Sequence, residues 1–328
     1  CLYIGIPFCP TRCLYCSFTS YPIGVYKDKV DAYLDTMEKE MEYIAESYTE
    51  KKLASIYIGG GTPSSISAEQ MDRLCSMIEK HFDLSQVREY TIEAGRPDST
   101  TADKLQVMKA HGVDRISINP QTMNGETLKL IGRAHTPEQA EEAFMRAREA
   151  GFDNINMDLI VGLPGEDAEM VKRTLEKVKK LAPESLTVHT LAIKRAAHLK
   201  QEMDKYSFAG DVDEQLSLVG QAAEELGLAP YYLYRQKNMA GNLENVGYAR
   251  HGLECLYNIL IMEERTDIIG IGAGSSSKLI RREGDLDPVT GETITGNRID
   301  RVENCKSVDD YIARIDEMID RKKQAFAK

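Results

Sequence analysis

Residues 7–16 read Pro-Phe-Cys-Pro-Thr-Arg-Cys-Leu-Tyr-Cys, and this stretch holds Cys9, Cys13 and Cys16. The C-x3-C-x2-C spacing lets one short loop place three thiolates around an iron–sulfur cube and leaves the fourth iron without a protein ligand. Thiolates are the usual protein ligands of such clusters, and four per cluster is the norm. The stretch therefore predicts a [4Fe–4S] cluster with one iron open to a small molecule.

A zinc site and a disulfide are the alternatives for these cysteines. Zinc favours C-x2–4-C pairs with a second pair further along the chain, and no second pair follows here. Seven cysteines, of which three share one loop, do not form the pattern of a disulfide framework. A cluster of this kind needs a reducing interior, so the cysteines favour a cytoplasmic protein.

The composition is that of an ordinary globular protein. The 328 residues, 42% of them hydrophobic, suffice for one barrel-type domain or for a domain with a smaller extension. No run of about 18 uncharged apolar residues is present, so we expect no membrane span. The net charge of −11 disfavours nucleic acid as a partner, because phosphate neutralisation dominates such binding.

The chain begins at Cys1 and enters a predicted strand at once, without a basic-then-apolar leader of the secretory type. We therefore expect it to be the C-terminal piece of a longer polypeptide, or a trimmed one. As a separate expectation, the protein is a monomer.

Short apolar runs alternate with amphipathic stretches along the first part of the chain. Strands are predicted at residues 2–6, 55–58, 89–92, 115–118, 154–161 and 185–191. Helices are predicted at residues 29–44, 136–150 and 167–181, and Ser67 with Gln70 forms the capping box of another. Six strand–helix units in a row favour a parallel α/β sheet, either open and doubly wound or closed towards a barrel. The cysteine loop follows the C-terminal end of the first strand, which favours a partial (βα)6 TIM-like barrel.

After about residue 191 the pattern changes. A helix near residues 211–226 precedes an aromatic stretch at 231–234, a Gly-rich segment at 267–277, a loop or hairpin at 284–296 and a last helix near 308–325. We predict a barrel over residues 1–195 and a C-terminal α+β extension over residues 196–328 that covers the barrel mouth.

Further motifs follow the predicted strands. Gly59-Gly60-Gly61-Thr62-Pro63 lets the backbone turn sharply and approach a ligand closely. Ser-Ile-Asn-Pro-Gln at 117–121, Gly-Arg-Ala-His-Thr at 132–136 and Asp-Leu-Ile-Val-Gly-Leu-Pro at 158–164 come later. With the cysteine loop, these motifs resemble the radical S-adenosylmethionine (SAM) enzymes and, among them, the oxygen-independent coproporphyrinogen III oxidase (coproporphyrinogen dehydrogenase) family. The Ser-Phe pair after Cys16 and Arg-Gln-Lys-Asn-Met at 235–239 resemble its HemZ-type branch.

The resemblance implies that the three cysteines ligate three irons, and that the open iron binds the amino and carboxylate groups of SAM. It assigns SAM contacts to Tyr3, Gly60, Gly61, Thr62, Glu93, Gln121, Arg133, Asp158 and Ala192. Tyr3 would stack near the cysteine loop. The glycines and Thr62 would line SAM, and Glu93 would accept hydrogen bonds from its amino acid or ribose portion.

The resemblance further implies that Gln121 and Arg133 hold the ribose and carboxylate, that Asp158 binds a ribose hydroxyl and that Ala192 lies on the adenine side. An Arg fork suits a carboxylate, and hydroxyls suit an acidic acceptor. The structural alternatives are a turn cap for Asp158, a surface position for Arg133 and a solvent-facing strand position for Glu93.

The activity that the resemblance implies begins with an electron from reduced flavodoxin or ferredoxin and cleavage of SAM to methionine and a 5′-deoxyadenosyl radical. The implied tetrapyrrole substrate is coproporphyrinogen III, which loses two carboxyl groups to give protoporphyrinogen IX. Radical modification or degradation of heme, and tetrapyrrole carriage without turnover, are the alternatives. Lys194, Arg195 and Arg235 are candidates for binding propionates, and no catalytic side chain is assigned.

Two departures limit the resemblance. Phe18 stands where the best-known branch has a fourth cysteine associated with a second SAM, which argues against a second SAM here. The heme-chaperone branch carries a His-Asn-x-x-Tyr-Trp motif. This chain has no Trp and only His251 and Tyr257-Asn258 in that region, so heme storage through that motif is not expected.

His135 follows the Gly-Arg motif and His189 lies on the last predicted strand, and both are expected to face the cavity of the predicted barrel.

Overall fold

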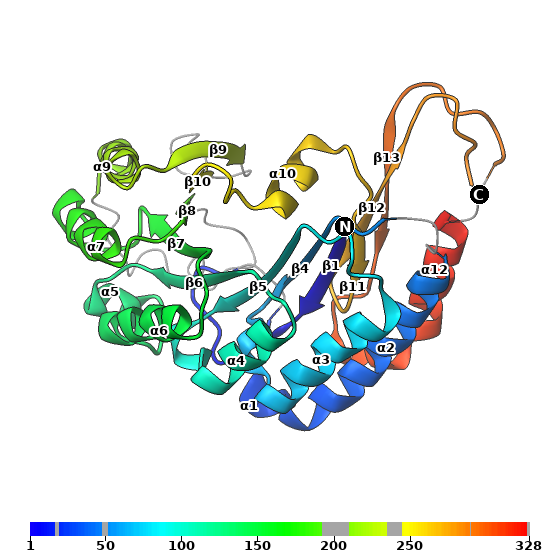
Figure 1. Ribbon diagram of the computed structural model, residues 1–328, viewed down its shortest axis with the longest axis horizontal. Helices are drawn as coiled ribbons and strands as arrows, with labels where there is room; N and C mark the ends of the chain where they lie inside the picture. The colour runs from blue at the N-terminus through cyan, green and yellow to red at the C-terminus, as the bar shows by residue number, and fades with distance from the viewer. Residues whose placement is uncertain (17–19, 48–51, 192–209, 235–244, 289, 327–328) are drawn as a thin grey trace. The chain divides into compact units, whose positions relative to one another are not determined.

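The computed structural model describes residues 1–16, 20–47, 52–191, 210–234, 245–288 and 290–326 (Figure 1). Contacts divide the chain into two compact units. The first unit comprises Cys1–Cys9, Thr19–Ile92 and Leu256–Lys328, and the second comprises Pro10–Phe18 and Glu93–Cys255. The domain boundary expected at residue 195 lies outside the described residues.

The first unit is built on parallel strands in the order β11-β1-β4-β5. Their bounds are Ile269–Ile271, Leu2–Ile6, Ser55–Gly60 and Glu89–Gly95, and the last three residues of β5 are assigned to the second unit. Leu2 pairs with Ile56 on one side and with Ile269 on the other. Isoleucines alternate along β1 and β4 and are fully buried, and they form the core beneath the helices.

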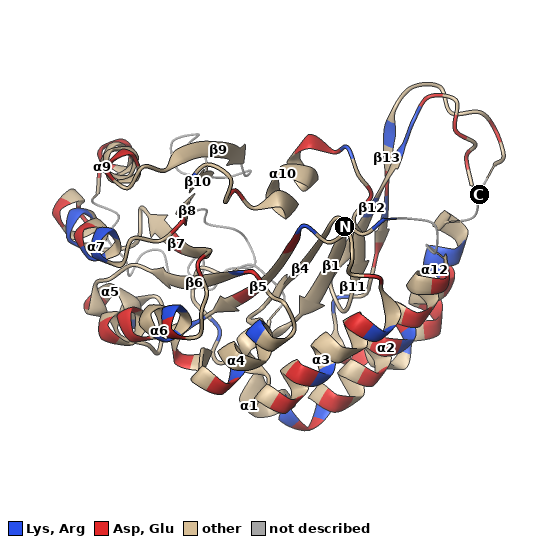
Figure 2. Ribbon diagram, viewed as in Figure 1, with Lys and Arg blue, Asp and Glu red and all other residues tan. Residues whose placement is uncertain are grey.

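Two long helices cover this core. In α2 (Val30–Ser47), the predicted apolar positions Leu34, Met37, Met41 and Ile44 are all buried. In α3 (Ala68–His81), Ser67 Oγ accepts from the Gln70 N–H at 3.2 Å and the Ser67 N–H donates to Gln70 Oε1 at 3.1 Å, so the predicted capping box is confirmed. The helices pack against each other (Figure 1) and carry charged side chains on their outer faces (Figure 2).

The C-terminal part of the first unit contains α10 (Leu256–Glu263), β11, the β12–β13 hairpin (Ser276–Arg281 and Arg298–Glu303), α11 (Val308–Ala313) and α12 (Ile315–Phe326). A buried charge ties these elements to α2. Glu40 is fully buried and accepts from Lys322 Nζ at 2.6 Å, from Asn304 Nδ2 at 2.8 Å and from the Gly272 N–H at 2.9 Å. Lys322 is also fully buried, so the carboxylate and the ammonium depend on each other.

The second unit contains the parallel strands β6 (Arg115–Gln121), β7 (Ile155–Val161) and β8 (Ser185–Thr190). Its helices are α4 (Ala102–Ala110), α5 (Gly125–Leu130), α6 (Pro137–Glu149), α7 (Ala168–Leu181) and α9 (Val212–Glu225). The helices predicted at 136–150 and 167–181 are confirmed, with Thr136 and Asp167 as their N-caps.

The aromatic stretch forms β9 (Ala229–Tyr234), and β9 pairs antiparallel with β10 (Asn245–Ala249), which in turn pairs antiparallel with β8. The sequence did not predict these strands as part of the sheet. Pro230 is accommodated because β9 is the last strand in the order, where a missing N–H costs no ladder bond. All six strands predicted from the sequence are present, and the α/β class with a parallel sheet is confirmed.

The remaining elements are short: β2 (Phe8–Cys9), β3 (Tyr21–Pro22), α1 (Ile23–Tyr26) and the 3-10 turns η1 (Lys27–Lys29), η2 (Pro63–Ser65) and η3 (Pro97–Ser99). In the part of the chain that the structure describes, no helix combines the length and the apolar character needed to cross a membrane.

Candidate functional site

In the first unit, the glycine segment packs directly on the strand that leads to Cys9. The Gly61 N–H donates to the Ile6 carbonyl and the Thr62 N–H donates to the Phe8 carbonyl, both at 2.8 Å. A Cβ atom on Gly61 would lie 2.7 Å from the Phe8 carbonyl oxygen and 2.9 Å from the Cys9 Sγ. Any side chain at Gly61 would therefore displace backbone or occupy the space beside the sulfur.

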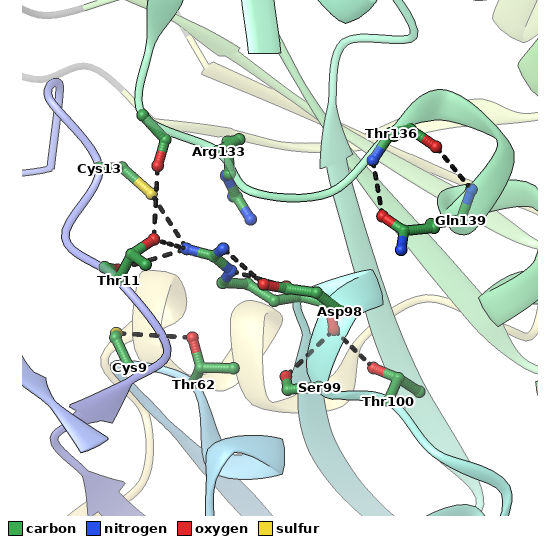
Figure 3. Close-up of polar contacts among 12 residues, drawn as sticks. Cys9, Thr11, Cys13, Thr62, Asp98, Ser99, Thr100, Arg133, Thr136 and Gln139 are labelled. Atoms are coloured by element: carbon green, nitrogen blue, oxygen red, sulfur yellow. Dashed lines mark hydrogen bonds and ion pairs between the residues drawn. The ribbon is translucent and has the colours of Figure 1, made fainter. Parts of the chain in front are cut away.

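Thr62 completes this contact. Its side chain is buried, and its hydroxyl donates to the Cys9 Sγ at 3.5 Å (Figure 3). Gly60, the residue before Gly61, has φ of +114°, a conformation that only glycine adopts without strain. The glycine segment and Thr62 thus fix the position of the first cysteine.

Tyr3 projects from β1 into an aromatic cluster. Its ring stacks on Tyr57 with centroids 6.2 Å apart and on Tyr257 with centroids 6.0 Å apart, and Tyr57 and Tyr257 stack at 4.5 Å. Tyr257 is anchored at the start of α10, because its N–H and that of Leu256 donate to the Glu89 carboxylate at 3.2 and 2.6 Å. The cluster therefore joins β1, β4 and α10.

In the second unit, Arg96 lies beside Cys13. Its guanidinium is 3% exposed and donates through Nη1 to the Thr11 Oγ1 at 2.7 Å and to the Cys13 Sγ at 3.9 Å. The Nε and Nη2 atoms donate to the two carboxylate oxygens of Asp98 at 2.9 and 2.7 Å (Figure 3). Burial alone would raise the pKa of Asp98, but the hydrogen bonds and the charge of Arg96 hold that pKa below its usual value.

The other side of the cysteine loop rests on the segment that contains Arg133. The Leu14 N–H donates to the Ile131 carbonyl at 3.0 Å. Arg133 Nε and Nη2 donate to the Tyr15 hydroxyl at 3.3 and 3.0 Å, and burial raises the pKa of that hydroxyl. Two arginines therefore fix the loop that carries Cys13 and Cys16.

Arg133 is not a surface residue. It is 7% exposed, and its buried Nη1 has no hydrogen-bond partner among the described residues. Guanidinium groups present donors in a fixed fork that matches a carboxylate. A buried N–H group without a partner is costly, and a bound anion would satisfy it.

Gln121 also presents an unsatisfied atom, and His135 is buried. Gln121 ends β6 at a register shift with φ of +69°, a sparsely populated conformation for a residue other than glycine, and no described residue donates to its buried Oε1. His135 is 3% exposed, and its ring interacts with the Pro120 backbone carbonyl. Burial, together with the charge of Arg133, lowers the pKa of His135 to about 4, so the imidazole is neutral near pH 7.

Asp158 belongs to a row of polar side chains on one face of β6, β7 and β8. Its Oδ1 accepts from Asn156 Nδ2 at 2.6 Å, and its Oδ2 lies 3.7 Å from His189 Nε2. Asn156 also donates to Ser117 at 2.9 Å and accepts from the Thr187 hydroxyl at 3.1 Å. Faces of parallel strands are usually apolar, so this polar row distinguishes the face of β6, β7 and β8 from an ordinary core. Asp158 is a mid-strand residue and caps no turn.

Glu93 lies on β5 with a half-buried side chain. Ala192, Phe18, Lys194, Arg195 and Arg235 lie outside the described residues. His251 is fully exposed and lies 3.4 Å from Glu254. The sequence did not single out Arg96 or Tyr15. Arg96 directly follows β5, which extends three residues beyond the third predicted strand.

The cysteines form no disulfide; all seven lie within the described residues. Cys9 belongs to the first unit, and Cys13 and Cys16 belong to the second. Among the described residues, no three His, Cys, Asp or Glu side chains gather closely enough to share one metal ion. A cube does not require this, since each thiolate binds a different iron.

Comparison with known proteins identifies the family. Residues 3–178 match the Radical SAM superfamily. The chain is 50% identical over 287 residues to the oxygen-independent coproporphyrinogen-III oxidase-like protein HemZ of Bacillus subtilis, covering 86% of this chain but only 57% of that protein. It is 33% identical over 289 residues to the heme chaperone HemW of Lactococcus lactis, covering 88% of this chain and 72% of the chaperone.

The fold agrees. The structure of coproporphyrinogen III oxidase (HemN) from Escherichia coli superposes with a TM-score of 0.73 at 23% identity, covering 97% of this chain and 69% of that one. This likeness confirms the radical SAM fold that the sequence predicted. The chain therefore belongs to the radical SAM superfamily.

Proposed function

We propose that this chain is the core of a radical SAM enzyme that acts on a tetrapyrrole by oxidative decarboxylation of the propionates of coproporphyrinogen III without oxygen. The observation that carries the enzyme proposal is the buried Arg133, whose Nη1 has no partner among the described residues although it adjoins the cysteine loop. Such a group suits the carboxylate of SAM. The tetrapyrrole substrate rests on the similarity to the HemZ and HemN proteins.

The residues present fit a [4Fe–4S] cluster and SAM. The missing side chain of Gly61 leaves room beside the Cys9 sulfur, and Arg96 directs an N–H at the Cys13 sulfur. Cys9, Cys13 and Cys16 would hold the cluster. When both are bound, a reduced cluster and SAM supply hydrogen-atom abstraction, which is chemistry that no side chain provides.

The side chains of this protein would bind SAM and orient it. Arg133 would hold the SAM carboxylate, and Gln121 would accept from a ribose hydroxyl through its open Oε1. Asp158 is held by Asn156 through one oxygen, which fixes the carboxylate for a second ribose hydroxyl. Tyr3, Glu93 and Ala192 keep the SAM contacts proposed for them from the family resemblance.

The partners are proposals of the same kind. Reduced flavodoxin or ferredoxin would deliver the electron, and a monomer in the cytoplasm would suffice. The substrate is a tetra-anion, whereas the chain carries a net charge of −11, so local cations must receive the propionates. Lys194, Arg195 and Arg235 stay the candidates for this role.

A tetrapyrrole carrier is the second candidate, because heme chaperones are among the similar proteins. His251 is the one histidine left from the chaperone motif, and it is fully exposed. A carrier role through that motif would require heme to bind through His251. Loss of heme binding in His251→Ala would support it.

The deciding experiment is an anaerobic incubation of the reconstituted chain with SAM, dithionite and either coproporphyrinogen III or heme, followed by mass spectrometry. Formation of 5′-deoxyadenosine with stepwise loss of two carboxyl groups supports the oxidase. A methylated or linearised tetrapyrrole supports heme breakdown. Tight binding of heme without 5′-deoxyadenosine at any reductant supports the carrier and overturns the enzyme proposal. Cys13→Ala is the control, since it removes a cluster ligand.

A further inference from the structure

The N–H groups of Arg96 are divided among three residues, with Asp98 at Nε and Nη2 and with Thr11 and Cys13 at Nη1. A guanidinium has five N–H groups in one plane. Asp98 takes the Nε and Nη2 edge through a bidentate pair at 2.9 and 2.7 Å. This pairing leaves Nη1 facing Thr11 and Cys13. Asp98 therefore sets the orientation of Arg96 towards the cysteine loop.

The backbone that carries Arg96 is also fixed. Its carbonyl accepts from the Ser99 N–H at 3.0 Å, from the Ser99 hydroxyl at 3.1 Å and from the Thr100 hydroxyl at 2.9 Å (Figure 3). Pro97 follows directly and begins the η3 turn. The Arg96 side chain is 3% exposed, so its N–H groups cannot exchange these partners for water. The direction of Nη1 is thus determined by the surrounding structure.

If Arg96 served only to hold the cysteine loop in place, its hydrogen bonds to Thr11 would be sufficient. The bond from Nη1 to Thr11 Oγ1 at 2.7 Å, with a second to the Thr11 carbonyl at 3.3 Å, already ties the loop to Arg96. The contact with Cys13 Sγ, at 3.9 Å, adds little to stability because it is long. The contact instead places a positive N–H group beside the Cys13 sulfur. Hydrogen bonds to cluster sulfurs and nearby charge are among the terms that set the reduction potential of an iron–sulfur cluster.

We propose that Arg96 is a positioning residue that directs an N–H to the Cys13 sulfur and so raises the reduction potential of the cluster. The inference rests on the proposed cluster but not on the identity of the tetrapyrrole. Reduction adds a negative charge to the cluster, and the oriented cation favours the reduced form. Asp98 opposes part of this effect, because its carboxylate is paired with the same guanidinium.

The opposition between Arg96 and Asp98 gives a test that a structural role would fail. Each variant is reconstituted anaerobically, its iron and sulfide are counted, and its potential is measured by a redox titration followed by electron paramagnetic resonance. Arg96→Met should make reduction about tenfold less favourable, a shift of about 59 mV to lower potential for one electron. Asp98→Asn keeps an oxygen acceptor for Arg96 and removes the opposing negative charge, so it should move the potential in the opposite direction. Arg96→Lys should lie between wild type and Arg96→Met.

Two controls separate loop position from electrostatics. Thr11→Val removes the short bond to the loop and keeps the N–H at Cys13, so its potential should stay near that of wild type. Arg148→Met removes a comparable arginine of the same unit, whose partners are Phe152, Ala182 and Glu184, and should shift nothing.

Unmoved potentials in Arg96→Met and Asp98→Asn, with full clusters, would overturn the inference. If Arg96→Met loses iron, the potentials of Arg96→Lys and Asp98→Asn are used instead. Shifted potentials in these two variants support the inference, and unmoved potentials overturn it. A wild-type chain that binds fewer than about three irons overturns the proposed function together with this inference, whereas a full cluster with unmoved potentials overturns the inference alone.

Discussion

Gly61 lies directly against Cys9, because a Cβ atom on Gly61 would stand 2.9 Å from the Cys9 Sγ and 2.7 Å from the Phe8 carbonyl oxygen. Backbone cannot yield as a flexible side chain does, so Gly61→Ala must move the strand that ends in Cys9. We expect a loss of about 1–3 kcal/mol in the free energy of unfolding and a reduced iron content after reconstitution.

Gly220→Ala is the matched control for this prediction. Gly220 lies within α9, and a Cβ added there would meet no heavy atom within 4 Å beyond its chain neighbours and the backbone of its own helix. Alanine in a helix interior is favoured over glycine by about 0.5–1 kcal/mol, so this variant should keep its iron and gain stability. Full iron content in Gly61→Ala would contradict the role given to the glycine.

Lys322 and Glu40 test the packing of the C-terminal helices on α2. Both side chains are fully buried, with Nζ 2.6 Å from Oε1, and Asn304 and Gly272 donate to the same carboxylate. Lys322→Met leaves a buried carboxylate without its cation, and we expect a loss of about 3–5 kcal/mol in the free energy of unfolding. Urea denaturation measures it. Lys29→Met, which removes an exposed partner of Asp309, should change stability little, and equal losses in the two variants would contradict the argument.

The strands and main helices could be predicted from the sequence because their information is local. The buried positions of α2 recur at helical spacing, and the Ser67–Gln70 capping box involves residues three apart. The contact of Arg96 with Cys13 could not be predicted, because it joins residues 83 positions apart and an arginine after a strand is most often solvated. The pairing of β9 with β10 was missed for a similar reason, since Pro230 reads as a strand breaker until the strand is known to lie at an edge.

Arg133 should govern the affinity for SAM. Its Nη1 is buried without a partner among the described residues, while Nε and Nη2 hold Tyr15. Arg133→Lys keeps the charge and loses the fork, and we expect the Kd for SAM to rise about tenfold, with a larger rise for Arg133→Met. Titration calorimetry on reconstituted protein measures the Kd. Arg148→Met is the control, and an unchanged Kd in Arg133→Met with a full cluster would contradict the assignment.

His135 should make the stability of the chain depend on pH. Its pKa in the folded chain is lowered from 6.5 to about 4, first by burial and then by the charge of Arg133. Between these two values the unfolded chain binds a proton that the folded chain does not, so stability falls as the pH falls from about 6.5 to about 4. His135→Gln removes this difference in proton binding, so the free energy of unfolding of that variant should depend less steeply on pH between about 6.5 and about 4. Urea denaturation at several pH values measures the slope. His251→Gln, which removes a fully exposed histidine, is the control. A slope in His135→Gln equal to that of the wild type would show that the imidazole is not held neutral by its surroundings.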